Sequence, residues 1–442
     1  MCGGGGGMAG RERALGRLKA RRGGGGAPAG SAAAAHGEAE EYMARMEEGL
    51  RALGLPGGGG GGAAGGQVVP GKVGLPGLGG AAEGPTDAAG GCAGGWLAEE
   101  AGLSGLARAS FDLSDRPLLC LSVRDGLAVA GGSDHGLYEV DLAKGRKARQ
   151  LYNKRFGHQE WVTCVTHLRD GRLLSGGMDS KLCLWDARGV RCSELAGHRG
   201  SVSCIQTDRE RPVAVSCSYD KTVRCWELGG SRPAEAWCMT KHRAPVLALA
   251  WGPGGLVASG ARDGKAVGTD LASGKAQWTL DAHEGHCTSL AWAKGGALLT
   301  GGQDGHVRGW DFRDDEKCFD VPAHADRHGS GAVGDILVHE DGETVVSVGA
   351  DMSVCVLDTR RAAKAVHTFR DHGDFVYSAL LCGDLLVTGD GQGEVLVHDV
   401  RQGQLLERLP AQTNAVRCLA LDAPARRLVL AGDDGNLLSL AA

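Results

Sequence analysis

The sequence lacks the features that would place the chain in a membrane or attach it to one. No apolar run approaches the roughly 18 residues of a membrane-spanning helix, and the N-terminus has no apolar core of a secretory signal. Met1 is followed by Cys2 rather than glycine, so myristoylation is not indicated, and the end at Ala442 carries no prenylation signal. We therefore expect an intracellular protein that is cytoplasmic, nuclear or both.

Strong charge and catalytic motifs are missing too. A net charge of -5 and a pI near 6.3 give no basic field that would attract nucleic acid or an anionic membrane. The sequence has no GxSxG nucleophile elbow, P-loop, HExxH motif or paired carboxylates. We predict that the protein is not an enzyme and has no catalytic residue, cofactor or metal.

The fifteen cysteines include no CxxC pair and no Cys/His spacing typical of a metal site. Several recur at equivalent positions of a repeat, as small buried apolar residues do: Cys164, Cys204, Cys418, Cys183, Cys225 and Cys355. This usage favours a reducing compartment.

Glycine is abundant, with 76 residues, and much of it lies before residue 95. Glycine runs have no side chains to bury, so we predict that residues 1–106 form a mostly disordered arm. A basic island at residues 11–22 is either solvated, or a contact for an acidic surface, or part of a transit peptide. Residues 37–54 are predicted to form a short amphipathic helix, which docks a partner or folds back on its own domain.

A repeat organises the rest of the chain. Between His158 and Asp186, three short apolar runs are separated by tight turns, which is typical of antiparallel strands. An Asp in the turn between the second and third strands recurs every 41 to 47 residues, with Gln392 replacing it in one unit. The eight turn positions are Asp134, Asp179, Asp220, Asp263, Asp304, Asp351, Gln392 and Asp434. Repeats of this length indicate a propeller or a solenoid.

The repeat resembles that of the WD-repeat β-propeller family. A Gly-His pair opens units at Gly157-His158 and Gly197-His198, and intact Trp-Asp pairs close units at Trp185-Asp186 and Trp310-Asp311. The resemblance implies an all-β domain over residues 107–442 with four strands per blade. We predict eight blades, with seven as the alternative. The last unit has three strands before the chain ends, so Arg108–Leu113 is placed to supply its fourth strand and close the ring.

The resemblance also implies a buried hydrogen-bonded tetrad of His, Ser or Thr, Asp and Trp in each complete blade. The tetrads would be His158, Ser175, Asp179 and Trp185; His198, Ser216, Asp220 and Trp226; and His283, Thr300, Asp304 and Trp310. His, Ser and Asp together look like a hydrolase triad, but a triad occurs once per active site. Because this set recurs with the repeat, we interpret it as structural.

Family analogy places partner binding on the face that carries the turns before each tetrad Asp and the loops after each Gly-His pair. The candidate face residues are Trp161, Met178, Tyr219, Arg243, Arg262, Gln303 and Phe375. Trp, Tyr and Arg are the types enriched at binding hot spots.

Two units end in Trp-Asp-x-Arg, with Arg188 and Arg313 as the last residues. Degenerate copies end at Arg360 and Arg401. These resemble the boxes through which some propellers contact the adaptor of a cullin–RING ubiquitin ligase, although a basic residue after Trp-Asp is also common in ordinary repeats.

We predict a non-enzymatic protein–protein interaction scaffold that docks partners on the face and rim of the propeller. The alternative is a substrate receptor of a cullin–RING ligase that uses Trp185–Arg188 and Trp310–Arg313. A weaker alternative is an RNA-associated subunit, which only the basic island favours.

Overall fold

The computed structural model describes Leu97 and residues 102–151, 156–208, 210–230, 232–312, 316–326, 329–361 and 364–442. All of them belong to the second of the two compact units into which the chain divides, Gly71–Ala442. These residues form eight four-stranded antiparallel sheets, which we number as blades 1 to 8 in chain order, and one two-stranded sheet.

The repeated turns form because the chain reverses tightly between the second and third strands of every blade. The residue after each turn position has a positive φ, from 64° to 85°, which is the left-handed region. Glycine occupies this position in half of the blades, as at Gly264 and Gly305, whereas Ser180 and Lys221 adopt the same conformation in blades 2 and 3. The same turn geometry in all eight blades confirms the repeat that the sequence indicates.

The strands of each blade follow in chain order from the centre of the ring outward, except in blade 8. Blades 1 to 4 consist of β2 (Leu118–Arg124), β3 (Leu127–Gly132), β4 (Leu137–Asp141) and β5 (Arg146–Gln150); β6 (Val162–His167), β7 (Leu173–Gly177), β8 (Leu182–Trp185) and β9 (Cys192–Leu195); β10 (Val202–Thr207), β11 (Val213–Ser218), β12 (Val223–Glu227) and β13 (Ala234–Met239); and β14 (Val246–Trp251), β15 (Leu256–Ala261), β16 (Lys265–Asp270) and β17 (Ala276–Asp281).

Blades 5 to 8 consist of β18 (Cys287–Trp292), β19 (Leu298–Gly302), β20 (Val307–Asp311) and β21 (Glu316–Val321); β24 (Val333–Val338), β25 (Thr344–Gly349), β26 (Val354–Asp358) and β27 (Lys364–Phe369); β28 (Val376–Cys382), β29 (Leu385–Asp390), β30 (Glu394–Asp399) and β31 (Gln404–Pro410); and β32 (Val416–Asp422), β33 (Arg427–Gly432), β34 (Asn436–Ala441) and β1 (Ala107–Asp112). Three 3-10 turns, η1 (Leu103–Gly105), η2 (Pro253–Gly255) and η3 (Thr359–Arg361), and the small β22 (Ala325–Asp326)–β23 (Gly329–Ser330) hairpin complete the described elements.

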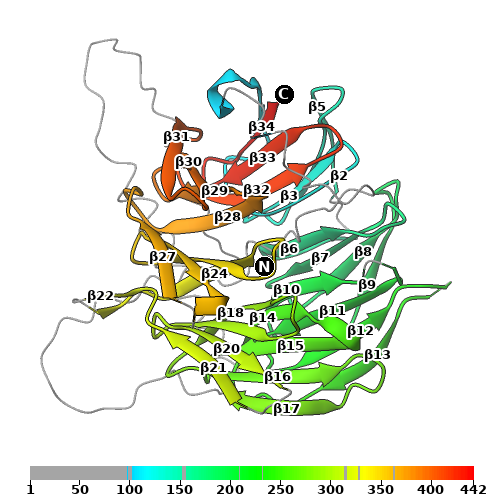
Figure 1. Ribbon diagram of the computed structural model, residues 1–442. Helices are drawn as coiled ribbons and strands as arrows, with labels where there is room; N and C mark the ends of the chain where they lie inside the picture. Colours follow the sequence, from blue (N-terminus) through cyan, green and yellow to red (C-terminus); the bar gives the residue numbers. More distant parts are fainter. Residues whose placement is uncertain are drawn as a thin grey trace, which may run out of the picture. The chain divides into compact units, whose positions relative to one another are not determined.

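The first strands of successive blades contact one another all the way around, and β32 of blade 8 contacts β2 of blade 1, so the ring closes with eight blades (Figure 1). The seven-bladed alternative is therefore wrong. Hydroxyl groups join neighbouring blades: Thr163 donates to the carbonyl of Val202 at 2.6 Å, and Thr288 donates to that of Val333 at 2.6 Å. Gly176 lets the blades approach, because an added Cβ would lie 2.8 Å from Val202 Cγ1 of the next blade.

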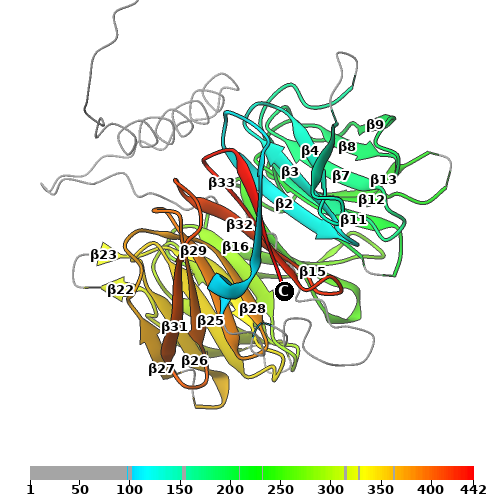
Figure 2. The same ribbon diagram turned by 90° about the horizontal axis from the view of Figure 1, so that it is seen from above.

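The N-terminal strand β1 completes blade 8 by pairing antiparallel with β34, from Ala107 opposite Ala441 to Asp112 opposite Asn436. Figure 2 shows this cyan strand beside the red strands of blade 8, with η1 at its start. The prediction that this stretch supplies the missing fourth strand is confirmed. Residues before β1 also contribute to the core, because Leu97, Leu103 and Leu106 are buried in a cluster with residues of blades 7 and 8.

Within the described residues, no helix is long and apolar enough to cross a membrane. The recurring cysteines are buried, as predicted from their positions in the repeat: Cys164, Cys183, Cys204, Cys225, Cys355 and Cys418.

Candidate protein-binding face

The tetrad residues of blade 2 meet in one buried network. His158 Nε2 lies 2.9 Å from Ser175 Oγ, and His158 Nδ1 lies 3.0 Å from a carboxylate oxygen of Asp179. The Trp185 indole N–H donates to Ser175 Oγ at 3.0 Å, and the backbone N–H of Gln159 donates to the other Asp179 oxygen at 2.9 Å. Ser175 is fully buried, so its hydroxyl cannot meet a substrate and instead bonds two buried partners, the Trp185 indole N–H and His158 Nε2.

The structure brings the same four residue types together in blades 3 and 5. In blade 3, His198 lies 2.9 Å from Asp220 and 2.8 Å from Ser216, which accepts the Trp226 indole N–H at 2.8 Å. Burial by itself would raise the pKa of Asp220, but the hydrogen bond and charge of His198 outweigh it, and the pKa stays below its usual range.

In blade 5, His283 lies 2.9 Å from Asp304 and 2.8 Å from Thr300, which accepts the Trp310 indole N–H at 3.0 Å. A strand hydroxyl, a turn carboxylate and an indole thus hold each loop histidine against the end of its sheet.

In blade 7 the carboxylate that contacts the loop histidine does not come from the turn position on which the sequence reasoning relied. Gln392 occupies the turn position, but Asp390 at the end of β29 contacts the histidine: its Oδ2 lies 3.2 Å from His372 Nδ1. Asp390 also accepts the backbone N–H groups of Gln392 and Glu394 at 3.0 Å each. The signal in the sequence was the Gly389-Asp390 pair, which stands where three other units have Gly-Gly.

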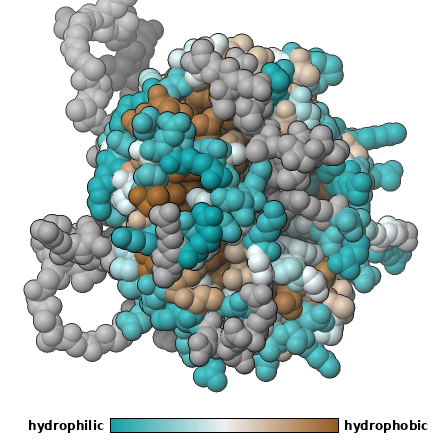
Figure 3. All heavy atoms as spheres, in the orientation of Figure 1, coloured by the Kyte–Doolittle hydropathy of each residue, from teal (hydrophilic) through white to brown (hydrophobic). Residues whose placement is uncertain are grey.

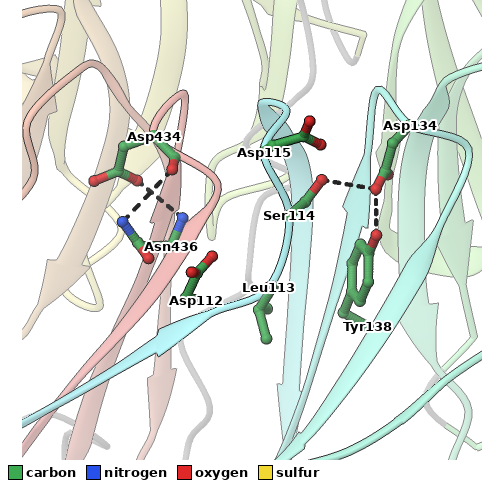
Figure 4. A pocket seen from close by; sticks show the side chains of 8 residues that line it. All are labelled: Asp112, Leu113, Ser114, Asp115, Asp134, Tyr138, Asp434 and Asn436. Carbon is green, nitrogen blue, oxygen red and sulfur yellow. Dashed lines mark hydrogen bonds between the residues drawn. The ribbon is translucent and has the colours of Figure 1, made fainter. Parts of the chain in front are cut away.

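Blade 1 has Ser114 at the position of the histidine. Ser114 Oγ donates to Asp134 at 2.7 Å, and Asp134 also accepts the hydroxyl of Tyr138 (Figure 4). Burial, together with this hydrogen bond to a carboxylate, raises the pKa of Tyr138 to about 12.

A cavity of about 650 Å³ opens here, at the seam between blades 8 and 1. Its lining is mostly acidic and polar: Asp112, Leu113, Ser114, Asp115, Asp134, Tyr138, Asp434 and Asn436. No group of three or more His, Cys, Asp or Glu side chains in the described part of the chain is arranged to hold a metal ion.

The predicted face residues gather at the loop end of the ring because one backbone hydrogen bond recurs in each blade. The backbone N–H of the residue before the turn position donates to the carbonyl of the residue that directly precedes the inner strand. The pairs are Met178 to Trp161 at 2.9 Å, Tyr219 to Ser201 at 2.9 Å, Arg262 to Pro245 at 2.9 Å, Gln303 to His286 at 2.8 Å and Gly391 to Phe375 at 3.0 Å. Arg243 is exposed on the loop after His242, and the other six predicted face residues are partly buried.

Three of these side chains, together with His286, form a row across blades 3 to 5, which we call the recognition row: Tyr219, Arg262, His286 and Gln303. Arg262 Nε lies 3.3 Å from His286 Nε2, and Gln303 Oε1 accepts the backbone N–H of His286 at 3.3 Å. Burial and the charge of Arg262 lower the pKa of His286 to about 4, so the neutral imidazole accepts the Arg262 N–H. Burial raises the pKa of Tyr219 to about 12, against the opposing charge of Arg262. Sequence reasoning missed His286, although it lies three residues after His283.

A second group on the face, made of Tyr377, Arg417 and Asp433, joins blades 7 and 8. Sequence reasoning missed Tyr377 and Arg417. The Arg417 guanidinium lies 4.2 Å from the ring centre of Tyr377 and binds both carboxylate oxygens of Asp433, at 2.8 and 2.7 Å. Tyr377 and Arg417 occupy the bulge position of their inner strands, where Thr163 and Thr288 stand in blades 2 and 5. The guanidinium of Arg417 is therefore already paired with a carboxylate of the same chain.

Blade 4 leaves its tetrad incomplete. His242 Nε2 bonds Ser259 Oγ at 2.7 Å, but three buried polar atoms of this blade have no hydrogen-bond partner among the residues that the structure describes: His242 Nδ1, Asp263 Oδ2 and Thr269 Oγ1. Thr269 stands at the position of the tryptophan and is too short to reach Ser259 as an indole would. Burial lowers the pKa of His242 to about 4, so this side chain is neutral at physiological pH.

The rim carries exposed apolar side chains on the outer strands of blades 6 and 7. Val366 on β27 is 44% exposed, and Leu405 and Leu406 on β31 are 37% and 52% exposed. Figure 3 shows apolar atoms between polar ones on the side of the ring that carries these blades.

The structure places Arg188 in an exposed turn after Trp185, where its side chain has no ion-pair partner among the described residues. The arginines of the two degenerate boxes differ, because Arg360 pairs with Asp358 and Arg401 pairs with Asp384. Arg313 lies outside the described residues, as do the basic island at residues 11–22 and the helix predicted at residues 37–54.

Comparison with known proteins gives one family. The model of the WD domain, G-beta repeat, matches residues 149–186, 189–227 and 274–311, which end in the tryptophan-containing strands of blades 2, 3 and 5. Among curated proteins, eukaryotic translation initiation factor 3 subunit I of Neurospora crassa is 35% identical over 83 residues, which are 18% of this chain and 24% of that protein. A p21-activated protein kinase-interacting protein 1-like of Danio rerio is 26% identical over 139 residues, 31% of this chain and 36% of that protein. The chain thus spans about a third or less of the length of such relatives.

Solved structures share the architecture. Sqt1 of Chaetomium thermophilum superposes with a TM-score of 0.66 at 18% identity, covering 76% of this chain and 97% of that one. The same protein bound to the N-terminus of the ribosomal protein L10 also gives 0.66, at 19% identity, over 76% of this chain and 99% of that one. At this identity the likeness concerns the fold.

Proposed function

Because the chain is a WD-repeat β-propeller, we propose that it is a non-enzymatic protein–protein interaction scaffold that docks partners on its loop face and rim. One contrast carries the proposal. The His, Ser and Asp groups that could perform chemistry are buried in tetrads, whereas aromatic and arginine side chains from successive blades reach the loop face. Rigid faces with aromatic and arginine anchors are the usual basis of hot spots.

Two further observations support docking. Sqt1, which has the same architecture, was solved bound to the N-terminus of the ribosomal protein L10, so a propeller of this kind holds a terminal segment of another protein. The rim strands add exposed valine and leucine side chains at Val366 and Leu406, where a second partner would find apolar surface. Occupying face and rim together would let the ring hold two partners at once.

The test is affinity purification of the full chain with identification of bound proteins. A face variant, Trp161→Ala with Phe375→Ala, is expected to lose most partners. A rim variant, Val366→Ser with Leu406→Ser, is the matched counterpart: it is expected to keep the partners that the face variant loses and to lose any partner that binds the rim. Circular dichroism and thermal unfolding establish that both variants fold. An unchanged set of partners with the folded face variant would contradict docking on the loop face.

A substrate receptor of a cullin–RING ligase is a second candidate, because Arg188 is exposed and lacks an ion-pair partner among the described residues, unlike Arg360 and Arg401. An arginine with this freedom can pair with a carboxylate of an adaptor. Co-purification of the adaptor with the wild-type chain, and its loss in Arg188→Ala with Arg313→Ala, would support this function. Absence of the adaptor from the wild-type chain would exclude it.

A further inference from the structure

The loop face is charged unevenly around the ring. Blades 3 and 4 carry a basic arc, and no member of it forms an ion pair with any residue in the described part of the chain: Arg199, Lys221, Arg243 and Arg262. The carboxylates in the turns of these blades, Asp220 and Asp263, belong to the tetrad positions. Glu284 is an exposed acidic side chain on the next loop of the face. The opposite side of the ring, at blades 8 and 1, carries the acidic cavity at the seam.

The contacts of neighbouring loops place this arc next to the recognition row. Gly200 lies against the Tyr219–Asp220 turn, with an added Cβ only 2.9 Å from the Asp220 nitrogen, so Arg199 sits beside that turn. Arg262 donates its backbone N–H to Pro245 at 2.9 Å, which brings the loop carrying Arg243 beside it. Among the described residues, the Arg262 side chain has one hydrogen-bond partner, His286, which its Nε contacts. The two terminal guanidinium nitrogens remain for a planar anion.

The orphan polar atoms of blade 4 lie under the same loop. In blades 2, 3 and 5 the loop histidine bonds the turn carboxylate, and the next residue donates its backbone N–H to that carboxylate. In blade 4 neither bond forms, and His242, 5% exposed, and Asp263 leave buried atoms unpaired. The loop that carries Arg243 is therefore held less firmly than its counterparts. An unsatisfied buried polar group in a native protein calls for an explanation, such as local strain, a functional role or a bound water.

We propose that the recognition row, with Arg243 above it, binds an acidic segment of a partner protein, an extended peptide that presents Asp or Glu side chains. Arg262 takes one carboxylate, Arg243 moves on its loosely held loop to the same or the next one, and the Tyr219 ring covers the aliphatic part of the chain. Charge complementarity selects this occupant, and the acidic seam opposite orients it by repelling its carboxylates. The inference rests on the proposed docking function of the loop face.

The first step of the test is selection of a random dodecapeptide display library on the purified full chain. Peptides enriched in Asp and Glu are expected. Enrichment of apolar or basic peptides, or of none, would overturn the proposal.

The second step measures an enriched peptide by fluorescence anisotropy. Arg262→Glu is expected to weaken binding about 30-fold, the size of a hot-spot loss. The same loss is expected when the peptide's Glu residues become Gln. Arg146→Glu is the matched control on the outer strand β5 and should change the affinity less than about twofold. If Arg262→Glu does not fold, Arg243→Glu decides, because this exposed side chain makes no described contact. Equal affinities for wild type and Arg243→Glu would then contradict the proposal.

Two outcomes separate this inference from the function on which it rests. If the Trp161→Ala, Phe375→Ala variant loses its partners while Arg262→Glu keeps them, docking on the face stands and the acidic-segment inference fails. If neither variant changes the partners, both fail. A phosphoserine peptide that binds more than about tenfold better than its Glu counterpart would show that the site selects phosphate, and would also overturn the proposal as stated.

Discussion

The carboxylate of Glu407, in the outer strand of blade 7, accepts the backbone N–H of Ser104 at 2.8 Å, across 303 residues of chain. It also accepts the N–H of Leu103, whose side chain is 3% exposed in the core of blades 7 and 8. The segment before β1 is thus fixed to a different blade from the one that β1 completes, and ring closure involves blade 7 as well as blade 8.

Glu407→Ala is expected to lower the free energy of unfolding by about 1–2 kcal/mol, because two backbone donors lose their acceptor. Leu103→Ala should cost more, about 3 kcal/mol, since it leaves a cavity in the core. Chemical denaturation of the full chain measures both. Glu160→Ala is the control, because this exposed carboxylate makes no described contact. Equal stability of Glu407→Ala and the control would show that the segment does not contribute to closure.

In blade 7, Asp390→Ala should destabilise the protein by about 3 kcal/mol, because this fully buried carboxylate holds His372 and two backbone N–H groups. Gln392→Ala should change stability by less than about 0.5 kcal/mol, since the Gln392 side chain contacts only the exposed carbonyl of Gly373. Thermal unfolding of the two variants compares them directly. A larger loss of stability for Gln392→Ala than for Asp390→Ala would show that the turn residue, and not Asp390, stabilises this blade.

Because the tetrad of blade 4 is incomplete, we expect that replacing its histidine, His242, lowers stability less than replacing His198 of blade 3. His198→Ala removes partners from both Asp220 and Ser216, whereas His242→Ala removes a partner only from Ser259. We expect His198→Ala to cost about 1 kcal/mol more than His242→Ala, although both side chains are buried. Denaturant unfolding of the two variants in parallel measures this difference, and equal losses would mean that His242 and Asp263 are paired in solution.

The ionisation of Asp335, on the inner strand β24, is expected to make the free energy of unfolding depend on pH. Burial raises its pKa to about 7, although it accepts the N–H of Ile336 at 2.8 Å. Its unfolded pKa is about 4, so the folded state binds the extra proton between these values, and this group makes the protein less stable as pH rises from about 4 to about 7.

Asp335→Asn removes that penalty. The variant should be more stable than the wild type at pH 8, on the order of 2 kcal/mol, and the gain should shrink at pH 5. Denaturant unfolding at both pH values measures it. A gain independent of pH would show that the change acts through packing instead of ionisation.

The sequence by itself indicated the repeat, the eight units and the strand that closes the ring, and its resemblance to the WD-repeat family implied the membership of three tetrads. These features are predictable because they depend on local order. His158, Ser175, Asp179 and Trp185 lie within one blade, where tight turns and strand register fix which side chains meet. The missing fourth strand of the last unit pointed to Arg108–Leu113 for the same reason: a sheet edge must be paired.

Only the tertiary structure decided the contacts between blades and the exceptions within them. Arg262 with His286, Tyr377 with Arg417, and Glu407 with Ser104 join different blades or distant segments, and their geometry depends on how whole sheets pack. Asp390 supplies the carboxylate that Gln392 at the turn position lacks, and His242 makes no bond with Asp263, although both blades keep the pattern of the repeat. The periodicity of the repeat predicts the position of a residue on its strand or turn. Which hydrogen bonds its side chain makes depends on distances of a few tenths of an ångström, and the packing of the sheets sets these distances.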